Sequence, residues 1–252
     1  MKEIQTIAIL ASNKGEFKLT KRTLPFYRRT SYTGGFLSQG NYKNLIILYL
    51  ETGIGTDHIE ERILGLLKDH KVDFAIATGF TGALEKEMKV GDIVIPSKIS
   101  SLSDKGEDYC PSSEAVDLFR SLKRNNGFKL YLDRNHLTVQ AVFFKEDKLR
   151  LKQTNPDVST IDMESFNIAR IFSKEKVPFI VIRTVSDELD FTFNNLKLLF
   201  GKKWQTNLLR FLGYCLVYPL EIANLIRFFS NLKKALKNNT GFILNFIDSL
   251  AA

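Results

Sequence analysis

Cysteine is scarce in this chain of 252 residues, which contains only Cys110 and Cys215. Two cysteines are too few for a disulfide framework, and no CxxC pair or Cys/His cluster predicts a metal site. The sequence therefore predicts no metal and no cofactor. It also favours a reducing compartment, so we expect a cytoplasmic protein.

Long apolar runs are also missing. The N-terminal stretch MKEIQTIAILASNKGE has an apolar run of only five residues, which does not predict a signal peptide. No run approaches the roughly 20 residues that a membrane-spanning helix needs. The hydrophobic content of 44% and charged content of 25% are typical of a soluble globular protein that can bury a large core.

Acidic residues are nearly missing from 197–237, where eight basic residues accompany a single acid, Glu221. This stretch supplies most of the net charge of +8. A basic segment can be a solvated face, a nucleic-acid contact or a contact with an anionic membrane. Nucleic acid is disfavoured because the chain has no groove motif that combines aromatic and basic residues.

Within the basic segment, 221–236 places apolar residues at helical spacing: Ile222, Leu225, Ile226, Phe229, Leu232 and Leu236. Two interpretations remain open. The segment packs as a helical hairpin on the domain or on a second subunit, or it forms a peripheral contact with an anionic membrane.

Strand-like apolar runs alternate with helical patterns along most of the chain. Strands are predicted at 6–11, 72–84, 90–100, 136–144 and 178–187, a helix at 112–124, and strand-to-helix units at 43–70 and 157–176. This alternation predicts an α/β fold: a single-domain three-layer sandwich with a central mixed, mostly parallel sheet. We expect this domain at 1–195 and a basic amphipathic helical extension at 196–252.

Two glycine-containing turns, TGIGT (52–56) and TGFTG (78–82), follow predicted strands. Neither is a Walker A or a GxGxxG motif, so neither predicts phosphate or dinucleotide binding by itself. They could be tight turns, or they could let the backbone approach a ligand closely.

Carboxylates follow the same strand ends. Glu16 comes after the first strand, Glu164 opens the helix of the 157–176 unit, and Asp187 ends the last strand. Ligands of such sheets bind where strand ends and loops gather. Asp162 can be explained as a helix cap, whereas a protonated acid facing an ionised one is suited to cleaving a glycosidic bond.

Three segments carry a family resemblance. ATGFTGALEKEMKVGDIVIP, IDMESFNIARIFSKEKVPFIVIRTVSDELD and TGIGTDHIEERIL resemble motifs of the purine nucleoside phosphorylase and nucleosidase superfamily. The resemblance covers about residues 4–190. Within the superfamily, the chain is most similar to methylthioadenosine/S-adenosylhomocysteine nucleosidases and to hopanoid-associated nucleosidases, which share the DMES spelling and a long helical tail.

The resemblance implies roles for individual residues. Asp187 would be the general acid that protonates the purine at N7, and Glu16 would position or activate water. Glu164 would accept hydrogen bonds from the ribose hydroxyls. The other implied substrate-binding residues are Met163 on the sugar, Phe144 on the base, Arg183 and Ser186 beside the acids, and the turn residues Gly79, Phe80 and Gly82.

Hydrolysis is favoured over phosphorolysis because the loop after the first strand, ASNKGEF, offers a carboxylate and only one cation, Lys14. The resemblance therefore implies an N-ribosyl hydrolase that releases adenine from an adenosyl nucleoside, either a small molecule or the lipid-linked adenosylhopane of hopanoid biosynthesis, and it implies a homodimer. The alternatives are a soluble methylthioadenosine/S-adenosylhomocysteine nucleosidase, a purine nucleoside phosphorylase, or a non-catalytic nucleoside- or lipid-binding protein. Phe80, Thr81 and Ala83 depart from the family pattern, and the bulk of Phe80 puts a small-substrate pocket in doubt.

Overall fold

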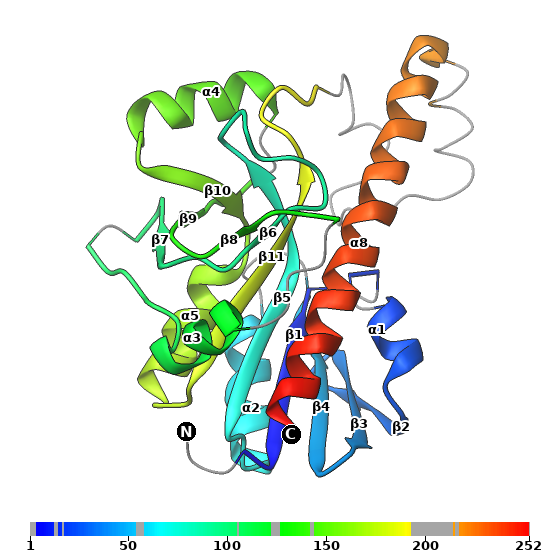
Figure 1. Cartoon of the computed structure of the whole chain (residues 1–252), viewed down its shortest axis with the longest axis vertical. Coiled ribbons are helices and arrows are strands. Elements are labelled where there is room, and N and C mark those ends of the chain that lie inside the picture. Colours follow the sequence, from blue (N-terminus) through cyan, green and yellow to red (C-terminus); the bar gives the residue numbers. More distant parts are fainter. Residues whose placement is uncertain are drawn as a thin grey trace.

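The structure is a computed structural model of the chain, and it describes residues 4–12, 15–16, 18–53, 58–104, 106–121, 127–141, 144–192, 214 and 217–251. In this part of the chain a mixed sheet is covered by helices on both faces, which confirms the α/β prediction (Figure 1). The strands are β1 (Thr6–Ala11), β2 (Phe26–Tyr32), β3 (Gly35–Tyr42), β4 (Leu45–Glu51), β5 (Phe74–Ala83), β6 (Ile93–Val94), β7 (Lys98–Ser101), β8 (Leu130–Tyr131), β9 (Asn135–Thr138), β10 (Val158–Asp162) and β11 (Phe179–Asp187). The helices are α1 (Lys18–Thr23), α2 (Ile59–Asp69), α3 (Ser113–Ser121), α4 (Lys145–Thr154), α5 (Ser165–Lys174), the short 3₁₀ helix η1 (Pro219–Glu221) and α8 (Ile222–Leu250).

The sheet runs in the order β2-β3-β4-β1-β5-β10-β9-β7, and β11 pairs with β5 and β6. The neighbours β4, β1, β5 and β11 are mutually parallel, whereas β10 is antiparallel to β5. Because β10 pairs only with the last residues of β5, three strands meet at that end. This junction is where the acid-bearing segments lie.

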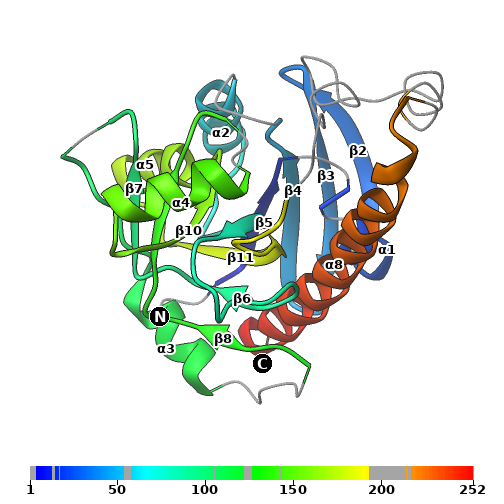
Figure 2. The same ribbon diagram turned by 90° about the horizontal axis from the view of Figure 1, so that it is seen from above.

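Two apolar clusters cover the two faces of the sheet, and Figure 2 shows their helices on opposite sides. One cluster packs α2 and α5 against β1, β4 and β5. The other packs α3 and α8 against the opposite face of the same strands. The strands read as continuous apolar runs because both of their faces are buried.

The C-terminal half of α8 is part of this core. Phe246 stacks on Phe119 of α3 with ring centroids 4.0 Å apart. The side chain of Asn239 is fully buried and hydrogen-bonded to Thr78 of β5 at 2.9 Å. Packing on the domain therefore accounts for this half of the helix. The domain boundary predicted between residues 195 and 196 falls within 193–213, which lie outside the described residues, and it stays a prediction.

Two predicted strands differ from the structure. The strand expected at 90–100 is split into β6 and β7, because Pro96 lies between them and has no N–H for the ladder. The strand expected at 136–144 ends at Thr138, and Phe144 is already the N-cap of α4. Helix α4 was not predicted because it buries Lys148, so its sequence has no regular apolar stripe.

Candidate active site

The carboxyl-terminal half of β5 connects two polar clusters. Gly79 faces the first, since a Cβ atom there would contact Arg183 Nη1 and lie 3.0 Å from Glu16 Oε2. Gly82 faces the second, since a Cβ atom there would lie 3.0 Å from Asp187 Oδ2 and 3.2 Å from Lys148 Nζ. The two glycines of TGFTG thus leave room for charged side chains against the strand, and a plain tight turn does not explain them.

Glu16 is the acid of the first cluster, and its side chain is held just after β1. Its Oε2 accepts hydrogen bonds from the backbone N–H of Ser12 at 2.9 Å and from the Ser12 hydroxyl at 2.6 Å. Burial raises the pKa of Glu16, while Arg183 and the Ser12 hydrogen bonds oppose the rise. A carboxylate with a raised pKa is a better proton acceptor, which suits a general base.

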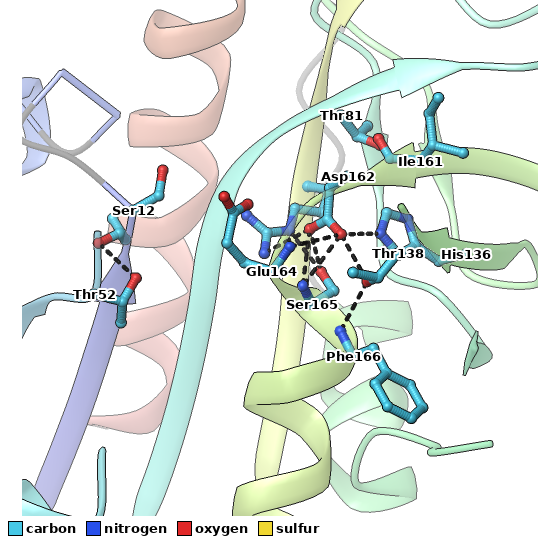
Figure 3. A network of polar contacts seen from close by, with 12 residues as sticks. Ser12, Thr52, Thr81, His136, Thr138, Ile161, Asp162, Glu164, Ser165 and Phe166 are labelled. Atoms are coloured by element: carbon cyan, nitrogen blue, oxygen red, sulfur yellow. Dashed lines mark hydrogen bonds and ion pairs between the residues drawn. The ribbon is translucent and has the colours of Figure 1, made fainter. Parts of the chain in front are cut away.

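Asp162 is the centre of the first cluster, shown in Figure 3. Asp162 lies two residues before the N-cap of α5 and supports the start of the helix, accepting from the Ser165 backbone N–H at 3.1 Å and the Ser165 hydroxyl at 2.5 Å. It is also paired with Arg183 Nη2 at 2.8 Å and with His136 Nε2 at 2.9 Å. Burial opposes its ionisation, but the charges of Arg183 and His136 prevail and hold the pKa of Asp162 far below its usual range.

This cluster fixes the start of α5, and with it Glu164. The backbone N–H of Glu164 donates to Asp162 Oδ1 at 3.3 Å, and Glu164 is the N-cap residue of the helix. Its side chain is buried, and Figure 3 shows its carboxylate turned away from the Asp162 cluster. Met163 is half-buried beside it. Arg183 is 1% exposed and donates to the Ser165 hydroxyl at 2.9 Å, so it connects Glu16, Asp162 and α5.

Asp187 is the acid of the second cluster, at the end of β11. Its Oδ1 accepts a hydrogen bond from the Ser186 hydroxyl at 2.7 Å, and its Oδ2 forms an ion pair with Lys148 of α4. Phe144 lies one helical turn before Lys148 and accepts its backbone N–H at 2.8 Å. Phe80 of β5 is half-buried, and its neighbour across the ladder is Thr184.

Four residues of these clusters were not predicted. Ser12, His136, Thr138 and Lys148 act through contacts between segments that are far apart in the sequence, and no local pattern marks them. Lys14 and residues 54–56 of the TGIGT turn lie outside the described residues.

The chemistry of this site is that of acids and hydrogen-bond donors. Among the described residues, no three His, Cys, Asp or Glu side chains are grouped so that they could hold a metal ion. None of the helices described is long and apolar enough to cross a bilayer. The clusters provide three carboxyl groups. Glu16 is buried and can take a proton, Asp187 can give one, and Glu164 lies at the N-terminus of α5.

The fold and this site define a mixed-sheet α/β protein with a carboxylate site at the strand ends. The chain belongs to the phosphorylase superfamily, whose family model matches residues 6–216. It is 24% identical over 200 residues to the 5'-methylthioadenosine/S-adenosylhomocysteine nucleosidase of Buchnera aphidicola, covering 73% of this chain and 85% of the relative.

Solved structures share the same fold. The chain is similar to a Colwellia psychrerythraea methylthioadenosine/S-adenosylhomocysteine nucleosidase in complex with adenine, with a TM-score of 0.74, 20% identity and coverage of 98% of this chain and 96% of that one. It is also similar to the futalosine hydrolase of Helicobacter pylori, with a TM-score of 0.75, 19% identity and coverage of 97% and 98%. These likenesses confirm the predicted architecture.

Proposed function

We propose that this protein is an N-ribosyl hydrolase that cleaves the N-glycosidic bond of an adenosyl nucleoside and releases adenine. The observation that carries the proposal is a pair of acids, Glu16 and Asp187, which lie against the two glycines of the TGFTG segment of β5. Glu16 is buried against Gly79 with a raised pKa, and Asp187 lies against Gly82. The nucleosidase relatives support the same activity.

In this reaction Asp187 gives a proton to N7 of the purine as the bond from the sugar C1′ to N9 breaks. The electron pair of that bond goes to the departing base. Water attacks C1′ and loses a proton to Glu16, which is held in place by Ser12. The sugar carries positive charge in the transition state, and the nearby carboxylates stabilise it electrostatically.

Glu164 would bind the ribose hydroxyls, with Met163 against the sugar, Phe144 on the base, and Phe80 at the edge of the pocket. These roles follow the motif positions, and the geometry is compatible with them. Glu164 is fixed at the N-terminus of α5, which is itself anchored through Asp162. Arg183 and Ser186 each contact or adjoin an acid, which fits supporting roles.

Water rather than phosphate is the nucleophile in this proposal. Glu16 is fixed where the nucleophile would enter, and a carboxylate there repels phosphate. The cation next to it, Arg183, is already paired with Asp162. A phosphate-binding site would need cations and N–H donors that are free to bind the anion.

For the substrate we propose a lipid-linked adenosyl nucleoside, adenosylhopane, handled by a homodimer. The observation that favours a lipid is on the N-terminal part of α8 and the segment before it. Val217, Ile226 and Phe229 are 67%, 66% and 46% exposed, and the cations Arg227 and Lys233 are exposed beside them. Figure 1 shows this part of α8, in orange, extending past the sheet. Exposed apolar side chains beside cations are suited to an anionic membrane surface.

The activity is tested by measuring adenine release chromatographically, with and without phosphate. The substrates are methylthioadenosine, S-adenosylhomocysteine and a lipid extract that contains adenosylhopane. The proposal expects phosphate-independent release from the lipid. Release from the small thioethers alone would assign the chain to methylthioadenosine/S-adenosylhomocysteine hydrolysis, and dependence on phosphate would make it a phosphorylase. Binding without release from any substrate would indicate a non-catalytic protein.

Membrane contact is tested separately by flotation with anionic vesicles. The Ile226→Asp/Phe229→Asp variant should float less than wild type, since it places charge in the exposed apolar patch. Tyr27→Asp is the matched control, because Tyr27 is 63% exposed and lies on β2. If wild type stays in solution with the vesicles present, the membrane contact is refuted.

A further inference from the structure

Lys148 is a buried cation that the reaction described above does not use. Its side chain is fully buried, although it lies on α4, a helix rich in exposed charges. Removing an ammonium group from water is costly unless the group is paired and hydrogen-bonded. The contacts that compensate this burial are all with the segment that carries Asp187.

The Lys148 ammonium group makes three such contacts. It pairs with Asp187 Oδ2, and it donates to the carbonyl oxygens of Asp187 at 3.3 Å and Glu188 at 2.9 Å. Gly82 leaves room for this arrangement, because a Cβ atom there would lie 3.2 Å from Lys148 Nζ. Lys148 therefore holds both the backbone and the carboxyl group of Asp187.

Few other described charges lie beside the Asp187 carboxyl group. Glu188 is the next residue, but it faces Lys89, with 3.2 Å between Lys89 Nζ and Glu188 Oε2. Asp190 is exposed. Ser186 donates to Asp187 Oδ1 and contributes no charge. Lys148 is thus the cation paired with Asp187 in the described part of the chain.

We propose that Lys148 is the positioning residue of Asp187: it fixes the carboxyl group at the end of β11, where the proton passes to the leaving base. The role rests on the proposed hydrolase activity. Asp187 takes a proton from solvent before each turnover and passes it to the leaving base. The Asp187 carboxylate that remains is held by its contacts with the ammonium group of Lys148.

The consequence for catalysis is a loss in the chemical step. Loss of the three contacts should lower kcat by about tenfold or more, because the acid is no longer held in place. KM should stay near its wild-type value, because Lys148 is not among the residues proposed to bind the substrate.

The test measures kcat and KM of adenine release for wild type, Lys148→Met and Lys148→Arg. We expect Lys148→Met to lose kcat with KM little changed, and Lys148→Arg, which can still pair with Asp187, to recover part of the loss. Lys152→Met is the matched control on the same helix, because Lys152 donates to the carbonyl oxygens of Pro156 and Val158, away from Asp187. Its kcat and KM should match wild type.

Lys148→Gln, which can still donate to a carbonyl oxygen, replaces Lys148→Met if circular dichroism shows that the latter does not fold. A wild type that releases no adenine refutes the proposed function and this role with it. A wild type that is active, with an unchanged kcat in the folded neutral variant, refutes the role of Lys148 alone.

Discussion

Replacing Asp162 with asparagine should destabilise the fold by about 3–5 kcal/mol at pH 7. Asp162 is 8% exposed and compensates two buried groups, Arg183 at 2.8 Å and His136 at 2.9 Å. An asparagine keeps the shape of the side chain but not its charge, so it leaves Arg183 buried without its counter-ion. A loss of this size is a large share of the roughly 5–15 kcal/mol by which domains are stable.

The pH dependence of this loss has a definite sign. The pKa of Asp162 is lowered in the folded protein, so its ionised form adds stability above the unfolded pKa of about 4. That contribution falls by about 1.4 kcal/mol per pH unit as the pH drops below this value. The difference between wild type and Asp162→Asn should therefore shrink below pH 4.

Urea unfolding followed by circular dichroism measures both effects. Asp157→Asn is the control, because Asp157 is an exposed carboxylate just before the same strand, and it should change stability by less than about 0.5 kcal/mol. The reasoning is refuted if Asp162→Asn costs no more than this control. It is also refuted if the difference between Asp162→Asn and wild type does not shrink in acid.

Three further perturbations test the site and its support. Glu16→Gln should lower kcat/KM by about 10²–10⁴-fold. The Tm of this variant relative to wild type should rise from pH 5 to pH 8, because burial raises the pKa of Glu16 and makes its ionised form unfavourable. A relative Tm that falls over this range would contradict the burial argument. Gly79→Ala should reduce adenine release strongly, since the new Cβ atom would contact Arg183 Nη1; unchanged kinetics would show that the strand can shift to accept it. Phe246→Ala should cost about 3–5 kcal/mol in urea unfolding, against a small change for the exposed Phe229→Ala; equal effects would refute the core role of α8.

The strands and the acid positions could be predicted because they depend on local patterns. Continuous apolar runs marked β1, β5 and β11, and a carboxylate at the end of such a run stands out against it. The family resemblance also implied that Arg183 lies beside the acids, although nothing in the sequence shows that it is 1% exposed. The partners of Arg183 come from segments that are brought together only in the folded chain.

The supporting residues could not be predicted, because their roles arise from the sheet order. His136 reaches Asp162 only because β9 and β10 are adjacent and parallel. Lys148 reads as an ordinary surface lysine until α4 is placed over the end of β11. The C-terminal segment was ambiguous for a related reason: one helix is buried at its C-terminal half and exposes apolar side chains at its other end.

The central claim is that an acid at the end of β11 drives cleavage of the N-glycosidic bond. Its most direct test is chromatographic adenine release by Asp187→Asn beside Asp190→Asn, with both variants checked for wild-type folding by circular dichroism. Asp190 is an exposed acid three residues further along the chain. We expect Asp187→Asn to lose at least about a hundredfold in kcat and Asp190→Asn to match wild type. Full activity in Asp187→Asn would contradict the account.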